Sequence, residues 1–492
     1  MSVHLSRPPS ATIKRSCRLL ATLLLLSPLC GIGAPAETPP AARANWMAQT
    51  RFGMFVHFGL YSIPGGVWEG QQAGRNAYAE WIRMQWGWPE QKGIPREKYD
   101  TLLARFNPEK FDAEEWIRLA DEAGMKYFVI TSKHHDGFAL WDSKVSTYDI
   151  ASTPFGKDGR DLLGELAAAC RKRGIKLGFY YSHWQDWEHP GGALPPWPEI
   201  KPDPPLDQPT DAAFQQYWDG KCLPQITELI ERYQPDMFWF DTWGKSSAVQ
   251  ITNARRDQLI ALIRERAPQC MINGRISYHD PAGADFVSMG DNAFPDRANA
   301  PKLPWETPAT MNHSWGYNRL DFSWRSFDEL LTRVIRNASH GGSVTLNVGP
   351  MGDGRIQDAA VRRLRQFAAW MTLHRHTLHG TTRGVFEPGE LPAGVHSTTG
   401  ADRIYLHLAG PVEELSLPAA RLPADTTLTA QVIETREFLP LTRAGETWVL
   451  QLPKHIAELD HPVLQIGAAS AISQQYEDGQ PVEPVQPGDF RR

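Results

Sequence analysis

A carboxylate, Asp241, lies among four aromatic residues in the stretch FWFDTW at residues 238–243. Moving a carboxylate out of water costs free energy unless the group is hydrogen-bonded, paired with a cation or used in chemistry. Because side chains alternate along a strand, Trp239 and Asp241 share one face of a predicted strand, while Phe238 and Phe240 share the other. Asp241 ends that strand, which indicates either a catalytic carboxylate at the edge of a sheet or a cap for the following turn.

Polar residues end several other predicted strands. They follow the apolar runs in VHFG, VITSK, FYYS and MINGR, and they are His57, His134, His135, Asp136, Tyr181 and Arg275. Polar side chains at successive strand ends suit a site that is assembled from the loops at one end of a barrel. Each residue alone also fits an ordinary structural role, such as a hydrogen-bonded core histidine or a turn residue. Their agreement favours a shared site.

Two reactions compete for such a site. A divalent metal held by His57, His134, His135 and Asp241 would activate water. However, the chain has no HxH pair on its first strand and no HExxH helix. The alternative is glycoside hydrolysis by two carboxyl groups, one acting as nucleophile and the other as general acid and base. This second reaction requires another carboxyl group near Asp241, and histidines and aromatic rings would hold the sugar.

The elements that would position these residues are eight short runs rich in β-branched and aromatic residues, within residues 52–349. They read FGMFVHFG, YFVITSK, KLGFYYS, DMFWFD, CMINGR, FVSMG, TMNHSWGY and SVTLNVG. Amphipathic helical segments lie between several of them, and this alternation predicts a parallel sheet covered by helices. No G-x-G-x-x-G fingerprint follows the first strand, so the pattern favours a (β/α)8-like barrel over a doubly wound sheet.

Two of the helices can be predicted in detail. Asp112 and Glu115 have the spacing of a capping box, and Gly124 supplies the stop for the first helix. The second helix ends before Pro235, and its apolar stripe consists of Ile226, Leu229, Ile230 and Tyr233. Both helices lead directly into predicted strands.

The pattern of predicted secondary structure changes after the predicted helix AAVRRLRQFAAWMTLHR. Short alternating segments such as RIYLHLAG, TLTAQVIE, TWVLQLP and HPVLQIG follow, and they predict a C-terminal antiparallel β-sandwich at residues 383–468. The catalytic (β/α)8-like barrel is accordingly predicted at residues 45–380. Residues 469–492 are polar and rich in proline, which predicts a disordered tail.

The N-terminus predicts export. Basic residues precede the apolar run LLATLLLL at residues 19–26, and APA at residues 34–36 offers a cleavage site, so residues 1–36 read as a signal peptide. The run is too short for a permanent transmembrane helix. We therefore expect no stable membrane insertion and a periplasmic or extracellular mature protein. The bulky Leu29 before Cys30 argues against lipoprotein processing.

Composition narrows the classes of partner. The chain has 492 residues and a formal net charge of -5, which gives no electrostatic footprint for nucleic acid. Its 18 Trp and 13 Tyr suit the flat faces of sugars, although large cores also use aromatic rings. The predicted mature chain keeps Cys170, Cys222 and Cys270, an odd number of well-separated residues that favours buried thiols over a disulfide framework.

Several motifs in series resemble the α-L-fucosidases of glycoside hydrolase family 29. They are RFGMFVHFGLYS, YAEWI, FNPEKFDAEEWIRLADEAGMKYFVITSKHHDGFALWDS, FWFD, NGR, WETPATMNHSWGYN and SVTLNVGPMGDG, and they span about residues 45–380 in the family's order. The resemblance implies a retaining exo-hydrolase that removes terminal α-L-fucose in two displacements. It places Asp241 as the nucleophile, which forms a covalent fucosyl-enzyme that water resolves.

The resemblance also implies partners for the nucleophile. Arg275 would keep Asp241 ionised, although Gly274 stands where the family usually has an acidic residue. Glu306 resembles the general acid and base, with Trp305 raising its pKa, and the two carboxyl groups would lie roughly 5–5.5 Å apart. The position of this residue varies in the family, so four other carboxylates stay open as alternatives, namely Asp280, Asp285, Asp291 and Asp296.

For the sugar, the resemblance implies a pocket with hydroxyl-binding groups on one wall and aromatic surface on another. The predicted substrate-binding residues are His57, Glu80, Trp81, His134, His135, Tyr181, Trp239, Arg275 and Trp315. No metal or organic cofactor is implied, and the expected partner is a fucosylated glycan or oligosaccharide. A non-catalytic fucose-binding protein is the alternative, and the oligomeric state stays open.

Overall fold

A computed structural model describes residues 43, 45–73, 78–85, 93–196, 200, 206–242, 249–423 and 427–468. The predicted signal peptide and C-terminal tail lie outside these residues. Eight strands form one parallel sheet in the order β7-β6-β5-β4-β1-β10-β9-β8. They are β1 Phe52–Val56, β4 Tyr127–Lys133, β5 Lys176–Tyr181, β6 Met237–Phe240, β7 Met271–Ile272, β8 Val287–Ser288, β9 Trp305–Thr310 and β10 Ser343–Val348.

The two end strands of this sheet meet, which makes the sheet a barrel. A parallel bridge joins Asn273 to Phe286. The Gly274 amide donates to the carbonyl of Phe286 at 2.8 Å, and the Asp285 amide donates to that of Ile272 at 2.8 Å. The closure brings the ends of β6, β7 and β8 together. The predicted (β/α)8-like barrel is therefore confirmed.

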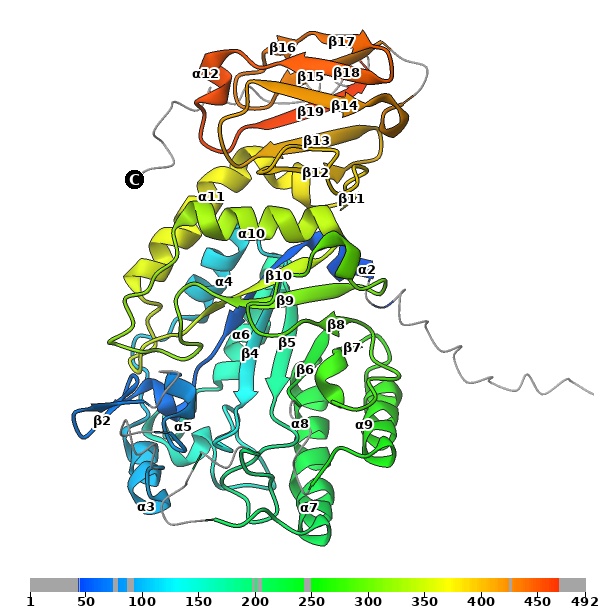
Figure 1. Cartoon of the computed structure of the whole chain (residues 1–492). Coiled ribbons are helices and arrows are strands. Elements are labelled where there is room, and N and C mark those ends of the chain that lie inside the picture. The colour runs from blue at the N-terminus through cyan, green and yellow to red at the C-terminus, as the bar shows by residue number, and fades with distance from the viewer. Residues whose placement is uncertain are drawn as a thin grey trace, which may run out of the picture. The chain divides into compact units, whose positions relative to one another are not determined.

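Helices cover the outer face of the barrel (Figure 1). The main ones are α4 Ala113–Glu122, α6 Leu162–Arg173, α8 Leu223–Tyr233, α9 Asn253–Arg266, α10 Phe327–His340 and α11 Asp358–Leu378. Shorter elements are α2 Asn45–Thr50, α3 Arg96–Tyr99, α5 Pro154–Lys157, α7 Asp211–Tyr217 and the hairpin β2 Val67–Trp68 with β3 Gln71–Gln72. The fully described segments 273–286 and 289–304, on either side of β8, contain no α-helix.

Both helices that the sequence predicts in detail are present. The Asp112 side chain caps α4 by accepting a hydrogen bond from the Glu115 amide at 3.1 Å. Gly124 follows the helix with a positive φ of 79°, which a glycine adopts without a steric cost. Helix α8 buries its predicted apolar stripe and ends at Tyr233.

Alternation along each strand divides the side chains between two cores. Phe238 and Phe240 of β6 pack in the large core between strands and helices. Trp239, Phe55 and Tyr127 pack inside the barrel. The interior is tight, because a Cβ atom added at Gly53 would lie 2.3 Å from the Tyr127 ring.

One predicted strand is in the wrong place. Residues 310–317, TMNHSWGY, form turns beyond Thr310, and the strand is β9 at Trp305–Thr310. This strand contains Pro308, a residue that is unusual inside a sheet because proline has no N–H to donate. The carbonyls of Glu306 and Pro308 both face the β8 side, where they accept from the amides of Met289 and Asn292. Since β8 ends at Ser288, the missing N–H of Pro308 faces no named strand.

The C-terminal strands form two antiparallel sheets around a separate apolar core, as a β-sandwich requires. One sheet contains β11 Thr382–Arg383, β12 Val395–Thr399, β13 Arg403–Leu408, β15 Leu428–Val432, β16 Phe438–Leu439 and β19 Val463–Ala468. The other contains β14 Glu414–Pro418, β17 Leu441–Ala444 and β18 Thr447–Gln451, and α12 spans Lys454–Ala457. The predicted β-sandwich is confirmed.

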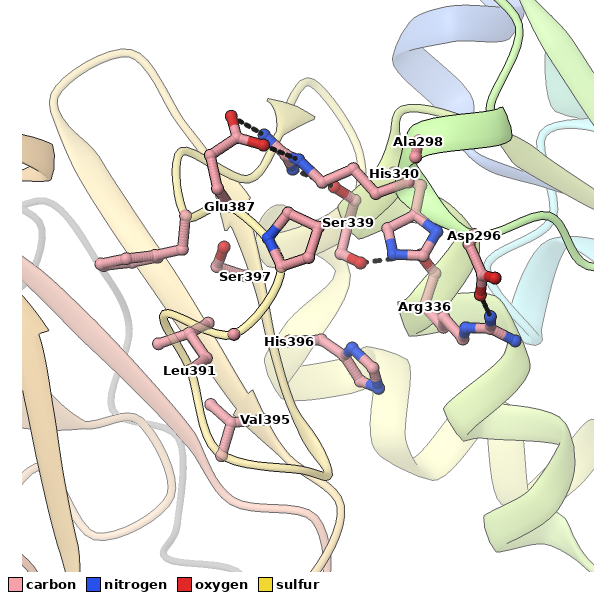
Figure 2. A pocket seen from close by; sticks show the side chains of 14 residues that line it. Asp296, Ala298, Arg336, Ser339, His340, Glu387, Leu391, Val395, His396 and Ser397 are labelled. Carbon is pink, nitrogen blue, oxygen red and sulfur yellow. Dashed lines mark hydrogen bonds and ion pairs between the residues drawn. The ribbon is translucent and has the colours of Figure 1, made fainter.

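Side chains from the barrel and from the C-terminal strands meet directly. His374 of α11 contacts Glu434 at 2.7 Å, and Arg297 contacts Glu387 at 3.1 Å. Figure 2 shows Glu387 beside a cavity of about 410 Å³, whose lining also includes Arg336 and His396. Both arginines at this cavity already have carboxylate partners, since Arg336 contacts Asp296 at 2.6 Å.

No helix in the described part of the chain is both long and apolar enough to cross a bilayer. The three described cysteines, Cys170, Cys222 and Cys270, are buried free thiols. This agrees with the prediction, made from the number and spacing of the cysteines, that these residues are buried thiols.

Candidate active site

A small pocket of about 40 Å³ opens at the carboxyl ends of the barrel strands. We call it the strand-end pocket. Its lining residues are Phe55, His57, Tyr78, Glu80, Trp81, His134, His135, Tyr180, Trp239, Asp241, Arg275, Asp291 and Trp315. The structure therefore brings together most of the residues that the sequence singled out, and it leaves out Asp136, Tyr181 and Glu306. The Asp136 carboxylate instead accepts a hydrogen bond from the Tyr99 hydroxyl at 2.9 Å.

Asp241 follows the last residue of β6 and is 7% exposed. Its Oδ2 accepts a hydrogen bond from the Tyr180 hydroxyl at 3.0 Å, and its Oδ1 accepts one from Arg275 Nη1 at 3.1 Å. Burial raises the pKa of Asp241, while the positive charge and hydrogen bond of Arg275 act in the opposite direction. The carboxylate is thus desolvated but held by a cation, which suits a nucleophile.

Arg275 connects this carboxylate to a second one. Its Nη2 contacts Asp291 Oδ1 at 2.6 Å and donates to the carbonyl of Met289 at 2.6 Å. The guanidinium also lies over the Trp239 ring, 4.8 Å from its centroid. These contacts fix the orientation of Arg275 although Gly274 precedes it, and they bring Asp241 and Asp291 to the same guanidinium.

Three histidines on the pocket wall are kept neutral by burial. Burial lowers the pKa of His57 to about 4. It also lowers the pKa of His134 and of His135 well below their usual value. A neutral imidazole has one N–H donor and one nitrogen acceptor, so each ring can bind a hydroxyl group without bringing a charge into the pocket.

Two of these rings are oriented by hydrogen bonds. His57 Nδ1 lies 2.7 Å from Asn347 Oδ1, which can only accept, so Nδ1 carries the proton and Nε2 is left as an acceptor. His135 Nδ1 lies 2.6 Å from Ser182 Oγ. Because the Ser182 hydroxyl donates to the carbonyl of Gln185, the His135 nitrogen is the donor in that pair.

Glu80 sits in a short 3₁₀ turn at Ala79–Trp81. Its Oε2 accepts from the Gly316 amide at 2.8 Å, and burial raises the pKa of Glu80 to about 7. Its Oε1 is buried and has no hydrogen-bond partner among the described residues, and the same holds for Nδ1 of His134. Buried polar atoms without partners are costly, so both atoms are suited to binding a polar ligand.

Aromatic rings supply the rest of the wall. The Trp239 ring stacks on Tyr180, with centroids 5.5 Å apart. The ring centroids of Trp315 and His57 lie 5.1 Å apart, and so do those of Trp81 and His135. The pocket thus combines neutral donors and acceptors with flat apolar surface, which suits a sugar.

The prediction that Tyr181 binds the substrate is wrong, because Tyr180 lines the strand-end pocket and Tyr181 does not. Along β5 the side chains of Leu177, Phe179 and Tyr181 face the helices. The Tyr181 hydroxyl donates there to Gln225 Oε1 at 2.7 Å. Tyr180 faces the interior with Trp239. The alternation of apolar residues at positions 177, 179 and 181 is a sequence signal that could have placed the Tyr181 side chain on the outer face of the barrel, toward the helices.

The prediction that Glu306 is the general acid and base does not fit its position. Glu306 has no exposed surface and does not line the strand-end pocket. Its oxygens accept hydrogen bonds from Trp239 Nε1 at 3.0 Å, Ser288 Oγ at 2.6 Å and Thr345 Oγ1 at 2.5 Å. A general acid must reach the glycosidic oxygen, whereas this carboxyl group is enclosed by three donors inside the barrel.

Among the four alternative carboxylates, Asp291 is the one that lines the strand-end pocket. Asp285 is buried against Arg43 at 2.7 Å and Arg264 at 2.6 Å. Asp280 and Asp296 pair with Arg256 and Arg336 at 2.6 Å each. Asp291 follows the two-residue strand β8, whose shortness left no clear periodic signal in the sequence.

The described residues contain no group of three or more His, Cys, Asp or Glu side chains arranged to hold a metal ion. The four side chains considered as ligands all line the strand-end pocket. Three of them are hydrogen-bonded to other groups instead: His57 to Asn347, His135 to Ser182, and Asp241 to Tyr180 and Arg275.

Comparison with known proteins identifies the family of this chain. The family model for alpha-L-fucosidase matches residues 36–376. The tissue alpha-L-fucosidase of Rattus norvegicus is 30% identical over 353 residues, which cover 68% of this chain and 70% of the relative. The plasma alpha-L-fucosidase of Homo sapiens is 29% identical over 350 residues, 68% of this chain and 69% of the relative.

A solved structure shares the fold over nearly its whole length. It is a trapped covalent intermediate of a family 29 alpha-L-fucosidase from Bacteroides thetaiotaomicron with 2-fluoro-fucosyl fluoride. It has a TM-score of 0.73 and 28% identity, and the match covers 88% of this chain and 97% of that one. The family-model match spans more than half of the sequence. The chain therefore belongs to the α-L-fucosidase family of glycoside hydrolases.

Proposed function

We propose that this chain is an exo-acting α-L-fucosidase that hydrolyses terminal α-L-fucose from glycans with retention, through a covalent fucosyl-enzyme. The observation that carries the proposal is the buried Asp241, held by Arg275 and Tyr180 in a pocket of neutral histidines and aromatic rings. The trapped covalent intermediate of the Bacteroides thetaiotaomicron relative supports the same chemistry.

In the first displacement, an Asp241 oxygen bonds to the anomeric carbon while the bond from that carbon to the leaving oxygen breaks. A general acid gives its proton to the leaving oxygen. In the second displacement, water gives a proton to the same group and attacks the anomeric carbon, and the bond to Asp241 breaks. Fucose is released and both carboxyl groups return to their starting state.

We assign the general acid and base to Asp291. Among the described residues, the carboxyl groups that line the strand-end pocket belong to Glu80, Asp241 and Asp291. Glu80 is 1% exposed and enclosed in the wall, whereas the Asp291 side chain is 40% exposed. An exo-enzyme's leaving group extends toward solvent, so the acid belongs at the exposed side. Arg275 bridges Asp241 and Asp291, which is compatible with the roughly 5–5.5 Å that retention requires.

Replacing Asp241 by alanine removes the nucleophile. We expect the wild-type protein to release nitrophenol from 4-nitrophenyl α-L-fucopyranoside, with α-fucose as the first anomer seen by NMR. We expect Asp241→Ala to lower kcat by about a thousandfold or more. A wild type that binds fucose without turnover would instead support the alternative of a non-catalytic fucose-binding protein.

The general acid can be identified by varying the basicity of the leaving group. Asp291→Asn should lower kcat/KM for 4-nitrophenyl α-L-fucopyranoside by about a hundredfold or more. It should have far less effect on the 2,4-dinitrophenyl substrate, whose leaving group needs no proton. Glu306→Gln and Glu80→Gln are the controls, and each should affect the two substrates equally. If a control variant lost activity mainly on the 4-nitrophenyl substrate and Asp291→Asn did not, Asp291 would not be the general acid.

Arg275 should set the acidic limb of the pH profile. Asp241 acts as a nucleophile only when ionised, so activity falls as the pH drops through its pKa. Removing the cation in Arg275→Met raises that pKa further, and the acidic limb of kcat/KM should move to higher pH by about one unit or more. Arg336→Met, which breaks an Arg–Asp pair outside the pocket, is the matched control. An unmoved limb in Arg275→Met would contradict the assignment.

We further infer export through the signal peptide at residues 1–36, with a periplasmic or extracellular mature enzyme. The support is the order of basic residues, the apolar run at 19–26 and APA at 34–36. Mass spectrometry of the protein from a secreting host should show an N-terminus close after APA. A retained N-terminus on the exported or intracellular protein would rule this out.

A further inference from the structure

A second cavity of about 610 Å³ adjoins the strand-end pocket. The two share Tyr78, Arg275 and Asp291 in their linings. These shared residues include both the proposed general acid and the cation that holds the nucleophile. The adjoining cavity therefore begins where the bond between fucose and its leaving group would lie.

The walls of the adjoining cavity are largely apolar. Pro281, Ala284 and Phe286 line it, together with two large side chains that stay open to solvent, Tyr278 and Leu303. Tyr278 is 44% exposed and Leu303 is 48% exposed. Large apolar side chains are exposed at a cost to the free protein, and a cavity that keeps them exposed offers that surface to a ligand.

The polar groups in this cavity are mostly engaged already. The Thr242 hydroxyl donates to the carbonyl of Arg275 at 2.7 Å, and the Ser288 hydroxyl donates to Glu306 at 2.6 Å. The Ser277 hydroxyl donates to the carbonyl of Ile251 at 3.3 Å. These three hydroxyl groups are therefore not free to donate to a ligand, in contrast to the strand-end pocket with its three histidines.

We propose that the adjoining cavity is the leaving-group subsite, and that it takes a leaving group presenting a flat apolar ring. This inference rests on the proposed function, because the subsite has a role only if fucose occupies the strand-end pocket. Tyr278 and Leu303 would cover the apolar face of the ring, and Asp291 would reach the oxygen between the ring and fucose. Specificity on this side would then come from shape and apolar contact.

The test compares two substrates that differ in whether they reach the cavity. One is 4-methylumbelliferyl α-L-fucopyranoside, whose leaving group is a flat bicyclic ring. The other is α-L-fucosyl fluoride, whose leaving group is a single atom. For the double variant Tyr278→Ala and Leu303→Ala, kcat/KM should fall about tenfold or more on the aryl substrate. It should stay within about twofold on the fluoride, which also verifies that the variant is folded.

Two control variants sharpen the comparison. Tyr278→Phe keeps the ring and should retain the wild-type ratio between the substrates. Phe438→Ala removes a similarly exposed ring, 53% exposed, from β16, and should leave both substrates unaffected.

Equal losses on both substrates, or no loss on either, in the double variant would overturn the subsite while leaving the proposed function in place. Failure of the wild-type protein to hydrolyse even the fluoride would overturn the proposed function, and the subsite with it.

Discussion

The contact between Asp241 and Arg275 is the interaction on which the site depends. A carboxylate enclosed by aromatic rings tends to take up a proton, and here a guanidinium opposes that tendency. The guanidinium is itself constrained, since it contacts Asp291, the carbonyl of Met289 and the face of Trp239. These partners come from the ends of β6 and β8, with Arg275 just beyond β7. The closure of the barrel at Asn273 and Phe286 is what places them within reach of one another.

Burial has opposite consequences for the different groups of the pocket. It removes the charge from the imidazoles of His57, His134 and His135, and it leaves Glu80 partly protonated near neutral pH. Arg275 keeps its charge and holds the neighbouring carboxylates. The imidazoles that would bind sugar hydroxyls are therefore neutral, and the negative charge of this wall is reduced at Glu80, while the full charges of Arg275 and its carboxylate partners lie at the reacting bond. Such an arrangement favours the charged transition state over the neutral substrate.

Much of this architecture can be predicted from the sequence where the period of the side chains is clear. The alternation in FWFD placed Asp241 and Trp239 on the inner face, and the same alternation in KLGFYY would have separated Tyr180 from Tyr181. The strand β9 contains Pro308, which fits there because the neighbouring strand β8 has already ended at Ser288. Where β8 ends depends on the tertiary structure, which the sequence pattern does not show. Glu306 lies on an inward face, but sequence spacing cannot show that Trp239, Ser288 and Thr345 enclose it.

The three described cysteines are buried free thiols at different places around the barrel, so their reactivity depends on local motions of the barrel. Cys170 lies in α6, Cys222 lies directly before α8 and Cys270 directly before β7, and none is more than 2% exposed. Burial raises the pKa of all three thiols, so both access and ionisation limit their reaction with alkylating reagents. Each thiol can react only when its own part of the wall opens. Alkylation rates at the three positions would thus measure local opening at three places around the barrel, without introducing any label or substitution.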